Sequence, residues 1–91
     1  MSADAAPPIR YRAGVYPDGT IETDVLIGYD VQKVVDDAKR AAEPEGWYEI
    51  WVQTPAGQDY HSEFVGEYHA QHPVREAVRD VKIYLENFPN A

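Results

Sequence analysis

Three histidines are the residues of this 91-residue chain best suited to bind a metal ion. His61, His69 and His72 fall within twelve residues of one another and are interspersed with carboxylates. Imidazole and carboxylate groups are ligands that zinc and similar ions accept. Their spacing matches none of the usual metal-binding motifs, and Pro73 disfavours a helix that would bring two of them onto one face. We interpret them as solvated loop residues and keep a small metal-dependent enzyme as an alternative.

A pair of carboxylates is the second candidate for chemistry. Glu49 and Glu63 could act as acid and base, as in glycoside hydrolysis. On neighbouring strands of a small sheet, however, no deep cleft would raise the pKa of one of them. Ser62 has His61 only as its chain neighbour, and no nucleophile elbow or glycine-rich phosphate loop is present. The sequence therefore predicts no enzyme activity and no cofactor.

The charge distribution indicates what kind of partner the chain would bind. The net charge is -8, and the stretch 41–74 holds six carboxylates without a single lysine or arginine. Such a field repels phosphates and attracts cations, which predicts a protein partner with a basic surface and no direct nucleic acid binding. Cysteines are absent, so disulfides are excluded. With no apolar run of about 20 residues and no signal-peptide pattern, we expect no membrane association and a cytoplasmic location.

Hydrophobic periodicity predicts two β-hairpins, each followed by a helix. Residues 1–8 are rich in proline and small side chains and are expected to form a disordered tail, whereas residues 9–91 form a single α+β domain. The element order β-β-α-β-β-α favours a four-stranded antiparallel sheet with two helices packed on one face. Matching turn residues at an offset of 38 and helices that align at 40 raise the alternative of an internal ββα duplication.

The first hairpin is predicted from the alternation of residues 9–16 and 20–28. A three-residue loop with Gly19 in the left-handed region pairs Val15 with Ile21 and directs the apolar residues of the second strand into the core. The second hairpin is predicted at 47–54 and 60–68. A five-residue loop is preferred there over a three-residue loop, and it pairs Ile50 with Phe64.

Both helices are predicted from apolar residues at helical spacing. Asp30 is a suitable N-cap for the first helix, and Pro73 fits the first turn of the second. Ile83 lies in the second helix but outside its apolar stripe. The stripe residues are Val31, Val34, Val35, Ala38, Ala41 and Ala42 in the first helix, and Val74, Ala77, Val78, Val81, Tyr84, Leu85 and Phe88 in the second.

The second hairpin supplies the predicted binding site. Its more continuously apolar face, assigned to the core, carries Tyr48, Ile50, Val52 and Phe64. The opposite face is left open, because two helices cover only one side of a sheet, and aromatic anchors with a charged rim are typical of protein interfaces. The predicted partner-binding residues on and around it are Trp47, Glu49, Trp51, Asp59, Glu63, Val65 and Glu67.

These features predict a small acidic, non-enzymatic protein-binding module. Acting on a basic protein surface, it would serve as an inhibitor, such as a phage-type anti-defence antagonist or a nucleic-acid mimic. A structural homodimer formed through the open sheet face is the first alternative. A further alternative is that Trp47 and Trp51 pack under a neighbouring loop, against the N-terminal tail or in the core, and so do not bind a partner.

Overall fold

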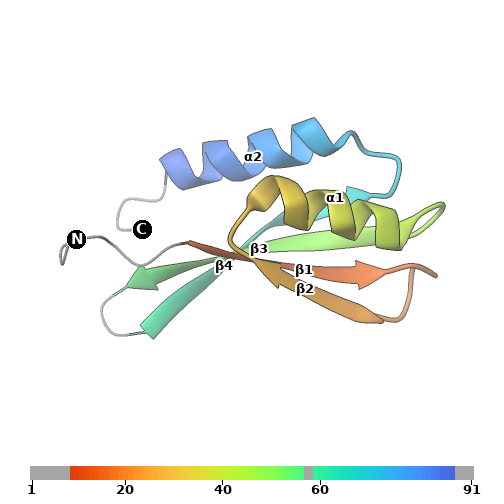
Figure 1. The fold of residues 1–91 in the computed structure, drawn as a ribbon, viewed down its shortest axis with the longest axis horizontal. Coiled ribbons are helices and arrows are strands. Elements are labelled where there is room, and N and C mark those ends of the chain that lie inside the picture. Colours follow the sequence, from red (N-terminus) through yellow and green to blue (C-terminus); the bar gives the residue numbers. More distant parts are fainter. Residues whose placement is uncertain (1–8, 57–58, 88–91) are drawn as a thin grey trace.

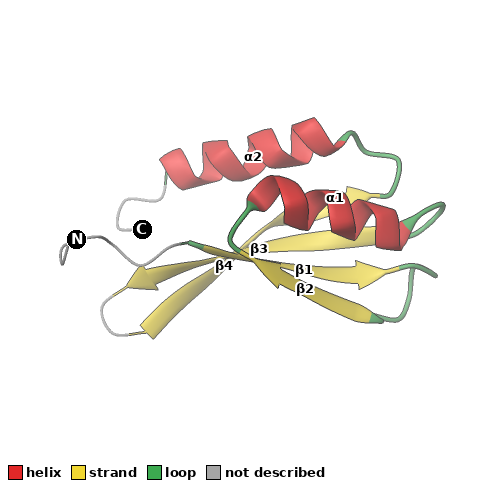
Figure 2. Ribbon diagram, in the orientation of Figure 1, coloured by secondary structure: helices red, strands yellow, loops and turns green. Residues whose placement is uncertain are grey.

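The computed structural model describes residues 9–56 and 59–87 and shows an α+β fold. The elements follow in the predicted order β-β-α-β-β-α, and the four strands form one antiparallel sheet in the order β2-β1-β3-β4. Both helices lie on the same side of this sheet (Figure 1), and no helix of the described residues lies across the other side (Figure 2). The predicted fold class is confirmed. The predicted tail, residues 1–8, lies outside the described residues.

The first hairpin has a different register from the predicted one. Strand β1 (Arg10–Tyr16) pairs with strand β2 (Asp24–Gly28) so that Val15 lies opposite Asp24. The predicted pairing of Val15 with Ile21 is therefore wrong. The displacement is an odd number of residues, and an odd displacement moves the side chains of a strand to the other face of the sheet.

The cause lies in the connection between these two strands. Gly19 has a φ of 87°, as the predicted turn requires, but the second strand does not start directly after it. The Gly19 carbonyl accepts a hydrogen bond from the Trp47 indole, and the backbone NH of Thr23 is the group that donates to β1. Val25 and Ile27 consequently lie on the face away from the helices, where 43% and 57% of their surface is exposed.

Helix α1 (Val31–Ala42) forms as predicted. The Asp30 side chain caps it by accepting hydrogen bonds from the backbone NH groups of Gln32 and Lys33. A cap of this kind contributes about 1 kcal/mol to helix stability. The helix residues buried against the sheet are Val34, Val35, Ala38 and Ala42.

The second hairpin is longer than predicted. Strands β3 (Trp47–Ala56) and β4 (Asp59–His69) leave only residues 57–58 between them, and those two lie outside the described residues. Ile50 lies opposite Gly66, so the predicted pairing of Ile50 with Phe64 is wrong, and so are the five- and three-residue loops. A register shift between Ile50 and Trp51 gives β4 one extra residue, as in a β-bulge.

Helix α2 (Val74–Glu86) completes the layer over the sheet, and Pro73 precedes it as the N-cap residue. Ile83 is 48% exposed, as its position off the apolar stripe predicts, while Phe88 lies outside the described residues. Within the described part of the chain, neither helix has the length and apolar character needed to cross a bilayer. The residues of α2 that are buried are Ala77, Val78 and Val81.

The core fills the space between the sheet and the two helices. Tyr48, Ile50 and Val52 are fully buried there, which confirms the face assigned to β3. Phe64 was assigned to the same face and is instead 40% exposed on the other side, because the extra residue in β4 changes which side chains point inward. The prediction for Phe64 is therefore wrong.

The arrangement bears on the predicted duplication. With order β2-β1-β3-β4, the first strands of the two hairpins lie side by side and each edge strand precedes a helix, as two copies of a ββα unit would if related by a twofold axis. The buried helix residues match at an offset of 43, since Val35 corresponds to Val78 and Ala38 to Val81. At the predicted helix offset of 40, Ala38 corresponds to the buried Val78, whereas Val35 and Ala42 correspond to Arg75 and Lys82. Duplication itself remains a prediction.

Candidate functional site: the open face of the sheet

The open face is the side of the sheet opposite α1 and α2, and a row of four residues crosses its middle. This central row takes one residue from each strand, each directly opposite the next. Two of its members, Ile27 and Phe64, are among the most exposed large apolar residues of the described chain. The central row consists of Ile27 from β2, Arg12 from β1, Trp51 from β3 and Phe64 from β4.

Trp51 holds the central row together through contacts on both sides. The guanidinium carbon of Arg12 lies 5.6 Å from the centroid of the Trp51 ring, within range of a cation–π interaction. On the other side, the ring centroids of Trp51 and Phe64 are 5.1 Å apart with the planes tilted by 52°. The result is a pre-ordered aromatic surface that faces solvent, and large aromatics held in this way lose little entropy on binding.

One half of the open face is basic. Next to the central row, Arg10 Nε donates to Gln53 Oε1 at 2.7 Å, and its guanidinium lies 5.2 Å from the centroid of the Tyr60 ring. Gln53 in turn donates to Ser62 Oγ at 3.0 Å. Together with Arg12, Arg10 gives this half two cations. Within the described residues, neither arginine forms an ion pair with a carboxylate.

The other half of the open face is acidic. Glu49 lies opposite Glu67 across β3 and β4, and opposite Gly14 across β3 and β1. The space above Gly14 is occupied by the carboxylate of Glu22, which a Cβ atom at position 14 would overlap. We call Glu22, Glu49 and Glu67 the acidic row. The open face therefore has an arginine half, which includes the central row and its aromatic side chains, and a glutamate half directly next to it.

Tyr16 connects two carboxylates of the acidic row. Its hydroxyl donates to Glu49 Oε1 at 3.4 Å. Desolvation and the negative charges of Glu49 and Glu22 raise the pKa of Tyr16, so the phenol stays protonated and available as a donor at neutral pH. This contact orders the carboxylates and supplies no nucleophile.

Trp47 lies at the end of the open face and is partly covered. Its ring stacks on Tyr16, with centroids 4.1 Å apart and planes within 4°, and its Nε1 donates to the Gly19 carbonyl at 3.1 Å. The alternative that a tryptophan packs under a neighbouring loop thus holds for Trp47. Trp51 makes no such contact with the loop among the described residues, and it remains the aromatic centre of the face.

The structure divides the predicted binding residues between the two faces of the sheet. Trp47, Glu49, Trp51 and Glu67 lie on the open face. Val65 and Glu63 were placed with them, and that placement is wrong for both residues. The side chain of Asp59 lies outside the described residues, although its backbone pairs with Ala56.

The contacts of Val65 and Glu63 show where they are. Val65 packs against the core under α2, and Glu63 lies opposite the buried Val52. Burial and the Glu63 carboxylate together raise the pKa of Tyr84 on α2, which places Glu63 on the helix side. Glu49 and Glu63 therefore lie on opposite faces and cannot act on one substrate as an acid–base pair.

Two of the three histidines, His61 and His69, lie far apart along β4. His61 lies opposite Thr54 and His69 opposite Trp47, eight residues apart along one strand, which is roughly 26 Å. His72 lies beyond the strand, with its Nε2 3.5 Å from Glu76 Oε2. The described residues include no group of three or more histidine, cysteine or acidic side chains able to hold a metal ion.

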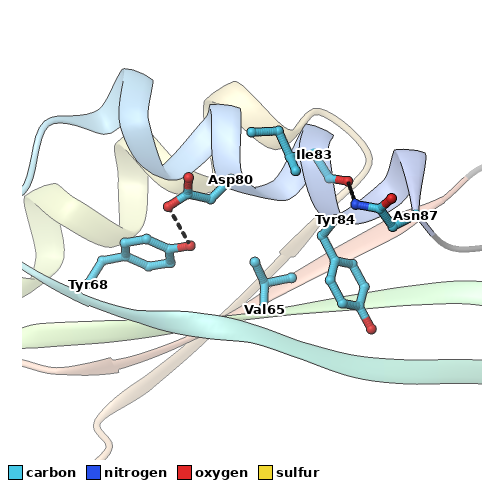
Figure 3. A pocket seen from close by; sticks show the side chains of 6 residues that line it. All are labelled: Val65, Tyr68, Asp80, Ile83, Tyr84 and Asn87. Atoms are coloured by element: carbon cyan, nitrogen blue, oxygen red, sulfur yellow. Dashed lines mark hydrogen bonds between the residues drawn. The ribbon is translucent and has the colours of Figure 1, made fainter.

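A hollow of about 340 Å³ lies between α2 and β4 (Figure 3). Its polar groups are occupied by one another: Tyr68 donates to Asp80 Oδ2 at 3.5 Å, and the Asn87 amide donates to the Ile83 carbonyl at 3.1 Å. Burial, followed by the charge of Asp80, raises the pKa of Tyr68 to about 12. The hollow thus offers an apolar floor at Val65, and its polar groups at Tyr68, Asp80 and Asn87 already form hydrogen bonds within the described residues.

Searches against protein-family models, curated proteins and solved structures found no match.

Sequence reasoning missed part of this face. Arg10 and Arg12 alternate with buried residues of β1, a pattern that already indicates exposure, but the acidic stretch drew attention to the second hairpin alone. Val25 and Ile27 were missed because alternating apolar residues were taken to face the core. Ile27 lies across Arg12 from Trp51 and Val25 lies opposite Gly14, and their exposure extends the site to β2.

Proposed function

We propose that the chain is a non-enzymatic protein-binding module and that the open face is its interface. The observation that carries this proposal is the central row, in which Ile27, Trp51 and Phe64 form an apolar band on three of the four strands, interrupted only by Arg12 on β1. Exposed clusters of large apolar side chains with polar residues around them are typical of surfaces that bind another protein. Tryptophan and arginine are also the residues most enriched among the strongest contacts of protein interfaces.

The acidic row indicates the chemistry of the partner. Glu22, Glu49 and Glu67 present three carboxylates beside the apolar band, so the partner is a protein that offers basic groups next to an apolar patch. The same carboxylates repel phosphates, which favours a protein over a nucleic acid. A module that covers a basic surface acts as an inhibitor wherever that surface is needed to bind another ligand.

The proposal is tested by comparing capture of partners from host extract by matched variants. Trp51→Ala and the double variant Glu49→Gln/Glu67→Gln should each lose the captured protein. The control, Glu45→Gln/Glu86→Gln, removes the same charge from exposed positions away from the open face and should bind as the wild type does. Capture should also weaken as salt rises from about 0.05 to about 0.5 M, because screening shortens the reach of exposed charges.

Two results would count against this function. Capture that survives both open-face variants would mean that the partner binds another surface. Equal losses in the control and in Glu49→Gln/Glu67→Gln would mean that net charge, and not the open face, governs binding.

A further inference from the structure

The sheet has two edges, and the edge formed by β2 is the more regular one. In the order β2-β1-β3-β4 the edge strands are β2 and β4 (Figure 1). An extra residue interrupts the pairing of β4, whereas β2 pairs with β1 over five consecutive residues without a shift. Bulges, prolines and lysines keep edge strands from pairing with another chain, and β2 contains none of them. Within the described residues no strand lies on the outer side of β2, so its outward NH and carbonyl groups are available to a further strand.

We propose that β2 of a second copy pairs with this edge, so that two chains build one eight-stranded antiparallel sheet. The twofold axis runs perpendicular to the sheet and passes between the two β2 strands. Such an axis reverses the strand direction and keeps the open faces of both copies on the same side. The contact uses the edge of the sheet and not the open face, so this inference does not depend on the proposed function.

The sequence of β2 is suited to pairing with itself. Residues opposite one another in a ladder point to the same face of the sheet, and the register that pairs all five residues of β2 places the axis at Leu26. Val25 of each copy then lies opposite Ile27 of the other, and Leu26 lies opposite itself. Val25 and Ile27 are 43% and 57% exposed in the single chain. The pairing therefore covers exposed apolar side chains with one another, and cross-strand pairs of this kind stabilise a sheet.

On the helix side, the same register extends an apolar hollow. This hollow, of about 370 Å³, lies between β2 and α1 and includes Leu26, Gly28 and Val34 in its lining. Leu26 points to this side because it lies opposite the buried Ala13. Leu26 of the second copy lies next to it in the dimer, so each copy adds apolar surface beside the hollow of the other.

The carboxylates near β2 leave room for this pairing. Asp24 lies opposite Gly28 of the second copy, which has no side chain. The two Asp24 residues are four positions apart along the ladder, or roughly 14 Å, which exceeds the screening length of about 8 Å at physiological salt. The carboxylate of Glu22 is folded back over Gly14 of β1, and that of Asp30 caps α1. Apolar contacts and backbone hydrogen bonds are therefore the forces that hold the dimer.

The dimer doubles the open face. Ile27 ends the central row at β2, and across the new ladder it is followed by Val25 of the second copy. A partner of the open face then meets two copies of it side by side on one continuous sheet, and simultaneous binding to both raises the overall affinity.

Single cysteines test the register, because the chain has no cysteine of its own. Opposite residues of an antiparallel ladder have Cα atoms about 4.5–5.5 Å apart, within reach of a disulfide. Leu26→Cys should therefore form a disulfide-linked dimer of twice the 10.3 kDa chain mass in a glutathione redox buffer. Val25→Cys and Ile27→Cys each lie roughly 8 Å from the same residue of the second copy, and each should link to itself at least tenfold more slowly.

A mixture of two variants separates the register from the fold. Equimolar Val25→Cys and Ile27→Cys should give the mixed dimer, which intact mass spectrometry distinguishes from the two homodimers. Both positions are exposed, so this pair decides the matter if Leu26→Cys fails to fold. Ile83→Cys on α2 is a matched control, because Ile83 is 48% exposed, and it should stay monomeric.

Sedimentation velocity measures the association without cysteines. The wild type should be dimeric. The double variant Val25→Lys/Ile27→Lys sets lysines opposite one another and should associate at least tenfold more weakly. Trp51→Ala changes the open face alone and should dimerise as the wild type does.

Three results would overturn the dimer. The first is a wild type that is monomeric at about 500 µM, above the Kd of a specific contact of modest size. The second is a set of folded cysteine variants of β2 that link at equal rates or not at all. The third is loss of the dimer in Trp51→Ala, which would place the contact on the open face. A monomeric wild type that still loses its captured protein on Trp51→Ala would overturn this inference and leave the proposed function standing.

Discussion

Ile50 and Trp51 are neighbours in β3 that lie on opposite faces of the sheet, and replacing each with alanine tests the assignment of those faces. Ile50 is fully buried, and truncation of an enclosed isoleucine costs about 3–5 kcal/mol in transfer and cavity terms. Trp51 is partly exposed, and its replacement removes the contacts with Arg12 and Phe64, which are worth about 1–2 kcal/mol together. The smaller side chain should therefore be the more costly one to remove.

Thermal unfolding followed by circular dichroism measures both effects. In a domain of this size, about 1 kcal/mol corresponds to a shift in Tm of about 4–8 °C. We expect Ile50→Ala to lower the Tm further than Trp51→Ala does, and urea midpoints give the comparison if Ile50→Ala unfolds near room temperature. A Trp51→Ala variant as unstable as Ile50→Ala would show that Trp51 belongs to the core and would refute the open-face interpretation.

Three further predictions concern the fold that supports this face. The Tyr48 hydroxyl is buried with no hydrogen-bond partner among the described residues, so Tyr48→Phe should raise the free energy of unfolding by about 1 kcal/mol. Tyr68→Phe removes the hydrogen bond to Asp80 and should not raise this free energy. Urea titration compares the two variants. Burial raises the pKa of the Tyr48 and Tyr68 phenols above the ordinary 10.0, so above that pH the folded state keeps protons that the unfolded chain has lost. The free energy of unfolding should therefore fall from about pH 10 upward, and it should fall more steeply in the wild type than in Tyr48→Phe. Gly46→Ala should cost about 3 kcal/mol or more in chemical denaturation, because its Cβ would overlap the backbone of Pro17 and Ala42, and a cost under 1 kcal/mol would contradict that packing.

The helices could be predicted from the sequence because the signals that define them are local. In α1, the Asp30 cap and the apolar spacing act within a few residues of each other, and the structure confirms both. The core face of β3 could be predicted for the same reason, since Tyr48, Ile50 and Val52 alternate without interruption. These parts of the fold need no knowledge of distant contacts.

The strand registers could not be predicted, because contacts distant in sequence determine them. In the first hairpin, the turn itself is as predicted, but Trp47 binds the Gly19 carbonyl and holds the following residues as a loop. In the second, Pro55 suggested a turn because proline is disfavoured within a sheet. Strand β3 extends past the start of β1, however, so Pro55 has no β1 residue opposite it. Its missing NH therefore costs no hydrogen bond to β1.

The candidate site was therefore predicted in part. The alternation of the second hairpin correctly predicts the face of Glu49, Trp51 and Glu67. The bulge in β4 interrupts this alternation, so the faces predicted for Val65 and Glu63 are wrong. The contribution of β1 and β2 depends on the register of the first hairpin. Only the structure shows that Arg12 and Ile27 complete the row that Trp51 and Phe64 begin.

The measurement that tests the central claim most directly is photo-crosslinking from two matched positions. Phe64 on the open face and Ile83 on α2 are 40% and 48% exposed, so a benzophenone amino acid at either site is similarly accessible. If the open face is the interface, the probe at position 64 should crosslink to the bound protein, and the probe at position 83 should not. Crosslinking from position 83 with none from position 64 would contradict the account.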